Sequence, residues 1–364
     1  MSHHHEQDDV TVREIPETRH AAIGWLTLVL FLAAMTAWEL KMRSLGLHTG
    51  DIDDSPAHWA VERRKIDEGD HEGVVIVGSS RILFDTDLSV WKEMTGRTPI
   101  QLALPGTSPR PYLRSVAEDT GFAGLVVCDV TPEMFFSRFI GALPQFVGMQ
   151  DTWRDQSPSE KFGHQVDLRL QRAFAFLDNE YSLFRLLERI VVEDDRLGPD
   201  GPYYDVWKLS VASENRQYFL WNRVEQAGYL QEHARAAWGP FGNERPPLPK
   251  DMIDAAIADV AESVRRIRAR GGEVVFIRPP SAGPFLEREN RNAPRMATWE
   301  RLLRETGAFG IHYEDYEAMR GLEVPEWSHL SRNSAARFTR AYVGVLLRER
   351  YVGLRTPPVL EPAR

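Results

Sequence analysis

The sequence predicts an α/β fold, in which a parallel β-sheet is covered by helices on both faces. Short apolar runs rich in β-branched side chains alternate along the chain with segments of helical periodicity. Two of these runs, residues 74–77 and 124–130, are almost entirely apolar, as expected of strands covered on both faces. A further run, residues 273–278, follows a long helical pattern and two glycines. Strands that alternate with helices in this way are typical of parallel sheets.

The other elements of this α/β domain can be placed in order. Strands are also expected at residues 98–104 and 311–313. The clearest helix covers residues 253–267, where isoleucine and valine recur at i, i+4, i+7, i+11 and i+14. Further helices are expected around residues 88–94, 112–117, 298–305 and 335–346. The α/β domain is therefore expected to cover residues 73–350, followed by a C-terminal tail, residues 351–364.

Residues 138–248 interrupt this alternation. They are rich in aromatic and arginine side chains, carry few strand signals, and space many apolar residues as helices do. Four prolines between residues 240 and 249 rule out a helix interior there and indicate a linker. We therefore expect a mostly helical insertion in the α/β domain. An aromatic stripe on a helix is more often core than ligand site, so these side chains are given no functional role.

An uncharged apolar run near the N-terminus predicts a membrane anchor. At ~1.5 Å per residue, residues 21–38 form a helix about 27 Å long, just enough to cross a bilayer core. Trp25 and Trp38 lie towards its ends, where aromatic belts occur. A cleaved signal peptide and a buried helix are the alternatives, but the residues after Trp38 lack the small side chains of a cleavage site. We expect a tail at residues 1–20, a transmembrane anchor at 21–40 and a polar connector at 41–72, in which a short helix follows the acidic run 51–54.

Composition and charge exclude several classes of function. The net charge is −9, and the chain has no basic tract interleaved with aromatic residues, so nucleic acid is not an expected partner. Its one cysteine, Cys128, cannot form an internal disulfide, and no Cys/His spacing predicts a zinc site. No metal or cofactor is therefore expected. Residues 3–5 are histidines of a tag or of the native chain and are left out of the argument.

The first predicted strand ends at a turn that carries a candidate nucleophile. The run Gly73–Val77 leads into Gly78, Ser79 and Ser80. In an open α/β sheet, ligands bind outside the carboxyl ends of the strands, where Ser80 is expected to lie. An ordinary turn is the alternative interpretation. A phosphate-binding turn is a weaker one, because neither a lysine nor a glycine-rich run accompanies it.

A serine hydroxyl needs a base, and the base needs a carboxylate to orient it. His329 follows the last predicted strand, and Glu326 lies three residues before it, so that both side chains can share one face of a turn. Gly106 follows the second strand, where a backbone N–H can approach a substrate oxyanion. The alternatives are a surface histidine at a helix start, a capping or solvated carboxylate, and a simple loop glycine.

These residues together resemble a known superfamily. Their order is Gly-x-Ser at 78–80, Leu-Ala-Leu-Pro-Gly at 102–106, and acid-x-x-His-Leu at 326–330 before a C-terminal helix. This order is similar to that of the SGNH (GDSL-like) hydrolases. Within that superfamily the chain resembles membrane-anchored bacterial members that act in D-alanylation or O-acetylation of envelope polymers. The resemblance covers about residues 73–136 and 272–349, but not the insertion.

The resemblance implies a flavodoxin-like three-layer α/β/α fold and a set of roles. Ser80 matches the nucleophile, and its backbone N–H and that of Gly106 match the oxyanion hole. His329 matches the base, and Glu326 occupies the position of the orienting aspartate. The implied enzyme is a serine esterase or O-acyltransferase acting on an acylated glycan or envelope polymer. The implied location is the bacterial inner membrane, with a single span, a periplasmic C-terminal domain and a polytopic acyl-donating membrane protein as partner.

Orientation in the membrane depends mainly on this resemblance, because basic residues on the two sides of the span are nearly balanced. Three departures from the superfamily pattern matter more for function. Ser79 replaces the commonest aspartate, the segment 129–133 lacks the usual oxyanion asparagine, and Glu326 replaces an aspartate. Anchored members often have serine at the position of Ser79, so that departure weakens the match little. The missing asparagine and Glu326 motivate an alternative, a catalytically inactive SGNH-like protein that binds glycan or scaffolds a polysaccharide modification system.

Two arginines are also expected near the predicted crevice. Arg81 follows the candidate nucleophile, and Arg278 ends a strand. Either could bind an anionic substrate. A structural ion pair is the commoner role for such a residue.

Overall fold

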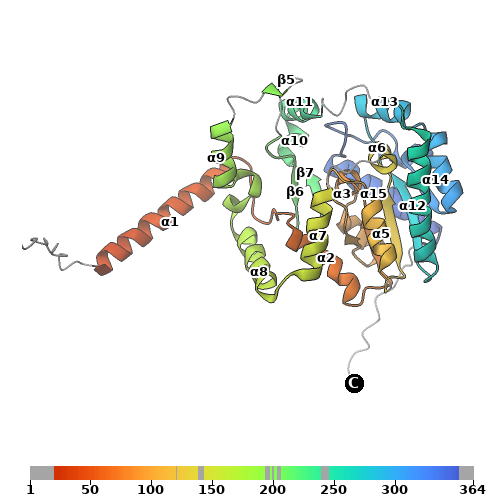
Figure 1. The fold of residues 1–364 in the computed structure, drawn as a ribbon. Helices are drawn as coiled ribbons and strands as arrows, with labels where there is room; N and C mark the ends of the chain where they lie inside the picture. The colour runs from red at the N-terminus through yellow and green to blue at the C-terminus, as the bar shows by residue number, and fades with distance from the viewer. Residues whose placement is uncertain are drawn as a thin grey trace, which may run out of the picture.

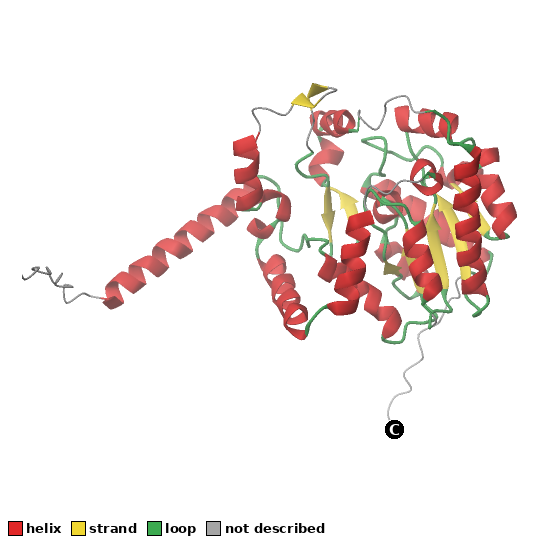
Figure 2. Ribbon diagram, viewed as in Figure 1, coloured by secondary structure: helices red, strands yellow, loops and turns green. Residues whose placement is uncertain are grey.

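The computed structural model describes residues 20–119, 121–137, 143–192, 197–198, 201–202, 206–238 and 246–351 (Figures 1 and 2). Almost all of the two predicted tails lies outside the described residues, as does most of the predicted proline-rich linker.

The centre of the molecule is a five-stranded parallel sheet in the order β2-β1-β3-β8-β9. Numbered along the chain, these strands run 2-1-3-4-5, which is the flavodoxin-like doubly wound order. The strand order reverses between β1 and β3, and ligands of such sheets bind at this switch point. The predicted α/β class and parallel sheet are thus confirmed. The strands are β1 (Val74–Val77), β2 (Ile100–Gln101), β3 (Leu125–Asp129), β8 (Glu273–Arg278) and β9 (Phe309–His312).

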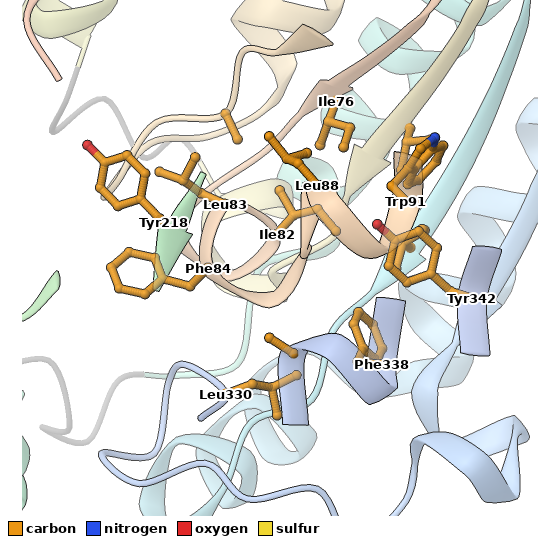
Figure 3. Packing of buried hydrophobic residues seen from close by; sticks show 14 of the residues in the cluster. Ile76, Ile82, Leu83, Phe84, Leu88, Trp91, Tyr218, Leu330, Phe338 and Tyr342 are labelled. Carbon is orange, nitrogen blue, oxygen red and sulfur yellow. The ribbon is translucent and has the colours of Figure 1, made fainter. Parts of the chain in front are cut away.

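Helices cover both faces of the sheet and make three layers. Alternation within β1 sends Val75 and Val77 to one face and Ile76 to the other, and all three are fully buried. On the side of Ile76, apolar side chains of three helices fill the core (Figure 3). These helices are α3 (Ser80–Asp85), α4 (Leu88–Thr95) and α15 (Arg332–Arg348). The opposite face is covered by α2 (Pro56–Asp67), α5 (Arg110–Glu118), α12 (Lys250–Arg268) and α14 (Trp299–Thr306).

Two elements of this body differ from the sequence prediction. The edge strand β2 is shorter than the predicted 98–104, although Leu102 N and Leu104 N still donate to the carbonyls of Ile76 and Gly78. The short helix expected in the polar connector is α2, but it packs on the sheet, because its Trp59 is buried and donates Nε1–H to the Leu102 carbonyl at 3.1 Å. The sheet needs a cover on this face, so α2 is part of the α/β body.

The described part of residues 138–248 is mostly helical, as predicted. It also contains two short antiparallel pairs, β4 (Leu197–Gly198) with β5 (Gly201–Pro202) and β6 (Ser210–Ala212) with β7 (Tyr218–Leu220), which the sequence did not indicate. Its helices are α7 (Leu143–Asp155), α8 (Pro158–Ala173), α9 (Leu183–Val192), α10 (Asn222–Gln226) and α11 (Gly228–Ala237), with 3₁₀ turns at Ala175–Leu177 and Asn179–Tyr181. We call residues 138–248 the insertion.

The helix α1 (His20–Ser44) contains the predicted anchor and extends away from the body (Figure 1). Among the described residues it is the helix that is long and apolar enough to span a membrane, and none of its apolar window is buried in the protein. Its C-terminal end is attached to the insertion, because the Glu39 carboxylate accepts hydrogen bonds from Ala175 N at 3.1 Å and Phe176 N at 3.0 Å.

Candidate functional site

Ser80 is the first residue of α3 and follows the turn that leaves β1. It is partly exposed, whereas the side chains of its neighbours Ser79 and Arg81 are buried. The turn requires glycine at position 78, since a Cβ there would overlap Ile82 and Asp129. Ser79 caps the helix and accepts a hydrogen bond from Arg81 N. The local sequence thus places the hydroxyl of Ser80 outside the core, at the carboxyl end of β1.

Asp129, at the end of β3, holds this turn at the switch point of the sheet. Its Oδ2 accepts hydrogen bonds from Ser79 N at 3.0 Å, Ser79 Oγ at 2.5 Å and Thr131 Oγ1 at 3.0 Å. Burial raises the pKa of Asp129, and these hydrogen bonds offset part of that rise. The sequence identified the segment 129–133 by its missing asparagine. The structure shows that its aspartate instead fixes the residue before the candidate nucleophile.

Glu326 and His329 lie together, as their spacing predicted. His329 Nδ1 is 2.9 Å from Glu326 Oε1, and His329 N donates to the same oxygen at 2.6 Å. Both side chains are buried. Burial alone would raise the pKa of Glu326, but the charge of His329 and the hydrogen bonds to the carboxylate hold it below its ordinary value. His329 Nε2 is buried and has no hydrogen-bond partner among the described residues.

The pair packs against the helix that Ser80 begins. The ring of His329 stacks on Phe84, with ring centres 4.3 Å apart, and Leu330 N donates to Asp85 Oδ1 at 2.9 Å. Phe84 lies four residues after Ser80, so both side chains lie on one face of α3. The structure therefore brings Ser80, Glu326 and His329 to the same short helix. Ser80 and His329 do not hydrogen-bond to each other.

Gly106 borders the serine turn. It has a φ of +65°, which favours glycine, and the space that a side chain would occupy there is open. The loop is tied to the turn because Leu104 N donates to the Gly78 carbonyl at 3.0 Å and Thr107 Oγ1 to the Leu104 carbonyl at 2.8 Å. An oxyanion role for Gly106 is compatible with this position and stays a prediction.

Arg81 and Arg278 meet at one buried carboxylate. Each donates to Glu289 at 2.6 Å, and Ser281 Oγ donates to it at 2.6 Å as well. Burial would raise the pKa of Glu289, but the two arginines lower it to about 2. Arg81 and Arg278 therefore have the geometry of structural ion pairs, which is the commoner of the two roles expected from the sequence. Binding of an anionic substrate by either arginine stays a prediction.

Two residues of the insertion support the site, and the sequence analysis gave neither a role. Trp238 Nε1 donates to Glu326 Oε2 at 2.5 Å, so the second carboxylate oxygen is occupied while the first holds His329. Arg235 Nε donates to the Pro325 carbonyl at 3.0 Å. Arg235 lies in α11, and Trp238 directly follows its last residue. Nothing near them in sequence distinguishes them from other aromatic and basic residues of the insertion.

The turn between Glu326 and His329 is strained. Trp327 has a φ of +75°, which a large side chain adopts rarely. Its carbonyl accepts a hydrogen bond from Ala282 N at 3.0 Å, and its indole packs against Gly283, where a Cβ would come within 2.9 Å of the ring. Strain of this kind clusters at functional sites, where surrounding contacts maintain it.

The chemistry open to this arrangement is proton transfer by an oriented imidazole. A carboxylate that accepts Nδ1–H leaves the Nε2 lone pair able to take a proton from a hydroxyl. Within the described residues, no cluster of histidine, cysteine and carboxylate side chains could hold a metal ion. No protein-family model matches the chain, and no curated protein matches it significantly.

Proposed function

We propose that this protein is a membrane-anchored serine esterase or O-acyltransferase of the SGNH type, acting on an acylated glycan or polymer of the bacterial envelope. The observation that carries the proposal is the Glu326–His329 pair. It stacks on the helix that begins at Ser80 and leaves Nε2 without a partner. The flavodoxin-like strand order and the position of the serine turn at the switch point also support it.

In the proposed reaction, Ser80 Oγ attacks the carbonyl carbon of an acyl ester while its proton passes to His329 Nε2. Glu326 stabilises the imidazolium that forms. The oxyanion is stabilised by backbone N–H groups of Ser80 and Gly106. Collapse of the intermediate breaks the ester C–O bond, and the leaving alcohol takes the proton from His329. Water or a glycan hydroxyl then attacks the acyl-serine by the same steps in reverse.

The helix α1 adds the location to the proposal. A single span near the N-terminus would hold the α/β body beside the inner membrane, on its periplasmic side, where lipid-linked or polymeric substrates lie close by. An integral membrane protein that delivers the acyl group would then be a suitable partner. The polytopic partner and the periplasmic side both come from the superfamily resemblance.

A fluorophosphonate probe tests the nucleophile. We expect labelling of the wild type and of Ser89→Ala, a change at an exposed residue of α4 whose hydroxyl donates to Asp87, but not of Ser80→Ala. Equal unfolding temperatures of the variants would show that the loss of labelling comes from the missing hydroxyl and not from unfolding. Wild type that stays unlabelled and hydrolyses no acyl ester would contradict the proposal. Transfer of a labelled acyl group to an added glycan would separate transferase from hydrolase.

One observation favours a second candidate, a non-catalytic scaffold: His329 Nε2 is inaccessible to solvent, so a substrate hydroxyl could not approach it without a movement of the site. The double variant Ser80→Ala, His329→Ala distinguishes the two. If cells carrying it modify their envelope polymer as the wild type does, the scaffold is correct. Loss of modification with normal protein level supports the enzyme.

A further inference from the structure

Large apolar side chains are exposed on two successive helices of the insertion. Phe162 of α8 is 69% exposed and Phe184 of α9 is 71% exposed. Such a concentration of apolar side chains on a protein surface marks an interaction site. We call these residues the apolar face. Its members are Phe162, Val166, Leu170, Phe174, Leu183, Phe184 and Leu187.

The helix α8 has the character of an interfacial helix. Phe162, Val166 and Leu170 are four residues apart and lie along one side of it, whereas Leu168 on the other side is buried in the protein. The exposed basic side chains of α8 include Lys161 and Arg169. Apolar residues on one face with lysine and arginine beside them are typical of helices that lie in the headgroup region of a bilayer.

Hydrogen bonds fix the depth of this face relative to α1. Glu39, the first charged residue after the uncharged run 21–38, accepts from Ala175 N and Phe176 N, just after α8 ends at Ala173. The end of α8 is therefore level with the end of the apolar run. Figure 1 shows α8 and α9 on the side of the body from which α1 departs.

The end of α1 and the residues after it are hydrogen-bonded to the insertion at more than one place. Beyond Glu39, the carbonyl of Leu45 accepts from Arg223 Nη1 at 2.8 Å, and that of Gly46 accepts from Trp221 Nε1 at 3.2 Å. These bonds restrict the swing of α1 against the insertion. Whatever surrounds the end of the span also meets the apolar face.

We propose that the apolar face docks on the lipid surface, with its phenylalanine and leucine side chains at the headgroup boundary and the basic residues of α8 on anionic headgroups. The lipid bilayer is chosen as the occupant because the bonds to Glu39 place the end of α8 level with the end of the exposed apolar run of α1. The span and the apolar face then hold the body at two places, so its orientation to the membrane is fixed. This inference depends on the membrane anchoring in the proposed function, but not on the proposed chemistry.

Depth-dependent quenching tests the docking in the full chain. Single cysteines introduced as Phe162→Cys and Phe184→Cys carry an environment-sensitive fluorophore, and the native Cys128 is buried. The protein is reconstituted in nanodiscs of phosphatidylcholine and phosphatidylglycerol, with or without lipids carrying a doxyl quencher near the headgroup. Met296→Cys is the matched control, because Met296 is an apolar side chain, 72% exposed, that lies outside the insertion.

We expect doxyl lipids to quench the probes at positions 162 and 184 and to leave the probe at 296 unchanged. Equal responses at all three positions would overturn the proposal. So would probes at 162 and 184 that ignore doxyl lipid but respond to protein dilution, because a second copy would then cover the face. A probe at Leu28 reports the span itself, and its failure to be quenched would refute the anchoring as well. Fluorophosphonate labelling of the same samples shows separately whether the proposed chemistry stands.

Discussion

The α/β body and the insertion contribute to the candidate site in different ways. The body supplies the groups that would react, at the ends of its strands, and it buries its apolar residues against the sheet. The insertion leaves apolar residues exposed, yet the end of its helix α11 reaches the carboxylate of Glu326. The groups that would react and a residue that holds one of them in place thus come from separate parts of one chain. Variants in the two regions should therefore fail differently.

Ion pairs join the insertion to the segment before α2, and we call this contact region the seam. Lys208 of the insertion pairs with Asp51 at 2.5 Å, and Arg216 pairs with Asp54 at 2.5 Å; both aspartates lie in the segment just before α2. Within the insertion, Lys208 also pairs with Asp178 at 2.6 Å. Buried charges of this kind are costly to separate from their partners. The insertion is therefore docked firmly enough to position side chains of the body.

The largest expected effect tests the body alone. Glu326→Gln keeps the size of the side chain but removes the charge that fixes the His329 tautomer. We expect activity to fall by about 10⁴-fold, as for the corresponding change in a serine protease triad. Glu323→Gln, the same change at an exposed position of the same loop, should behave as the wild type. Ester hydrolysis rates measure both, and equal rates for the two variants would contradict the assigned role.

A second prediction concerns the buried cluster of the body. Glu289→Gln leaves Arg81 and Arg278 without their carboxylate and should cost about 3–5 kcal/mol of unfolding free energy. The matched variant Glu287→Gln, exposed on the same helix, should cost little. Denaturant unfolding compares them. A small loss in Glu289→Gln would show that the cluster is not structural and would favour a substrate-binding role for the arginines.

The same cluster predicts a pH dependence. The pKa of Glu289 is about 2 in the folded protein and ordinarily about 4.3, so the folded state prefers the ionised carboxylate. Its contribution to stability is present above about pH 4 and is lost as the pH falls towards 2. Glu289→Gln should therefore lose less stability than the wild type over this range, when both are unfolded by denaturant at each pH.

Local patterns explain why so much of the body could be predicted. Periods of two and 3.6 residues identified the strands and helices, and the rule that sites form at strand ends selected Ser80 and His329. The contact between Glu326 and His329 followed from a spacing of three residues. The ion pair between Arg81 and Glu289 could not be predicted from spacing, because Glu289 lies far along the chain and on a different helix.

The insertion could be predicted only in outline. Its helical character was visible, but a hydrogen bond between Trp238 and Glu326 spans 88 residues and depends on how the insertion docks. The contact of Asp129 with the serine turn could not be predicted for a related reason. The missing asparagine is visible in the sequence, whereas the hydrogen bond that Ser79 donates to Asp129 requires two strands to lie side by side.

A third prediction tests whether the insertion supports the site. Trp238→Phe keeps an aromatic ring but removes the N–H that donates to Glu326. Loss of a hydrogen bond to a charged group is worth about 1.5–3 kcal/mol, so activity should fall by about 10- to 100-fold. That bond also lowers the pKa of Glu326, so the acid limb of the pH–activity profile should move to higher pH. A merely structural role would lower activity without that movement. Trp207→Phe, elsewhere in the insertion, is the control.

The smallest expected effect concerns the seam. Asp53 lies beside Asn179 of the insertion, whose Nδ2 donates to it at 3.2 Å, and its backbone N donates to Gln171. Burial, together with the charges of Asp54, Asp167 and Glu180, raises the pKa of Asp53 to about 6. The folded state thus prefers the protonated acid. The stability contributed by Asp53 is present below its ordinary pKa of about 3.9 and is lost as the pH rises through about 6.

Asp53→Asn should therefore raise the unfolding free energy by about 1 kcal/mol at pH 8, a value reduced by partial exposure to solvent, and by about half as much at pH 5, because that pH lies about midway between the unfolded and folded pKa values. Thermal unfolding at the two pH values measures this difference. Asp151→Asn, at an exposed position of α7, removes the same charge from the surface and should change neither value. Equal stabilisation at both pH values would show that the gain in unfolding free energy comes from packing. It would contradict the repulsion between Asp53 and the neighbouring carboxylates.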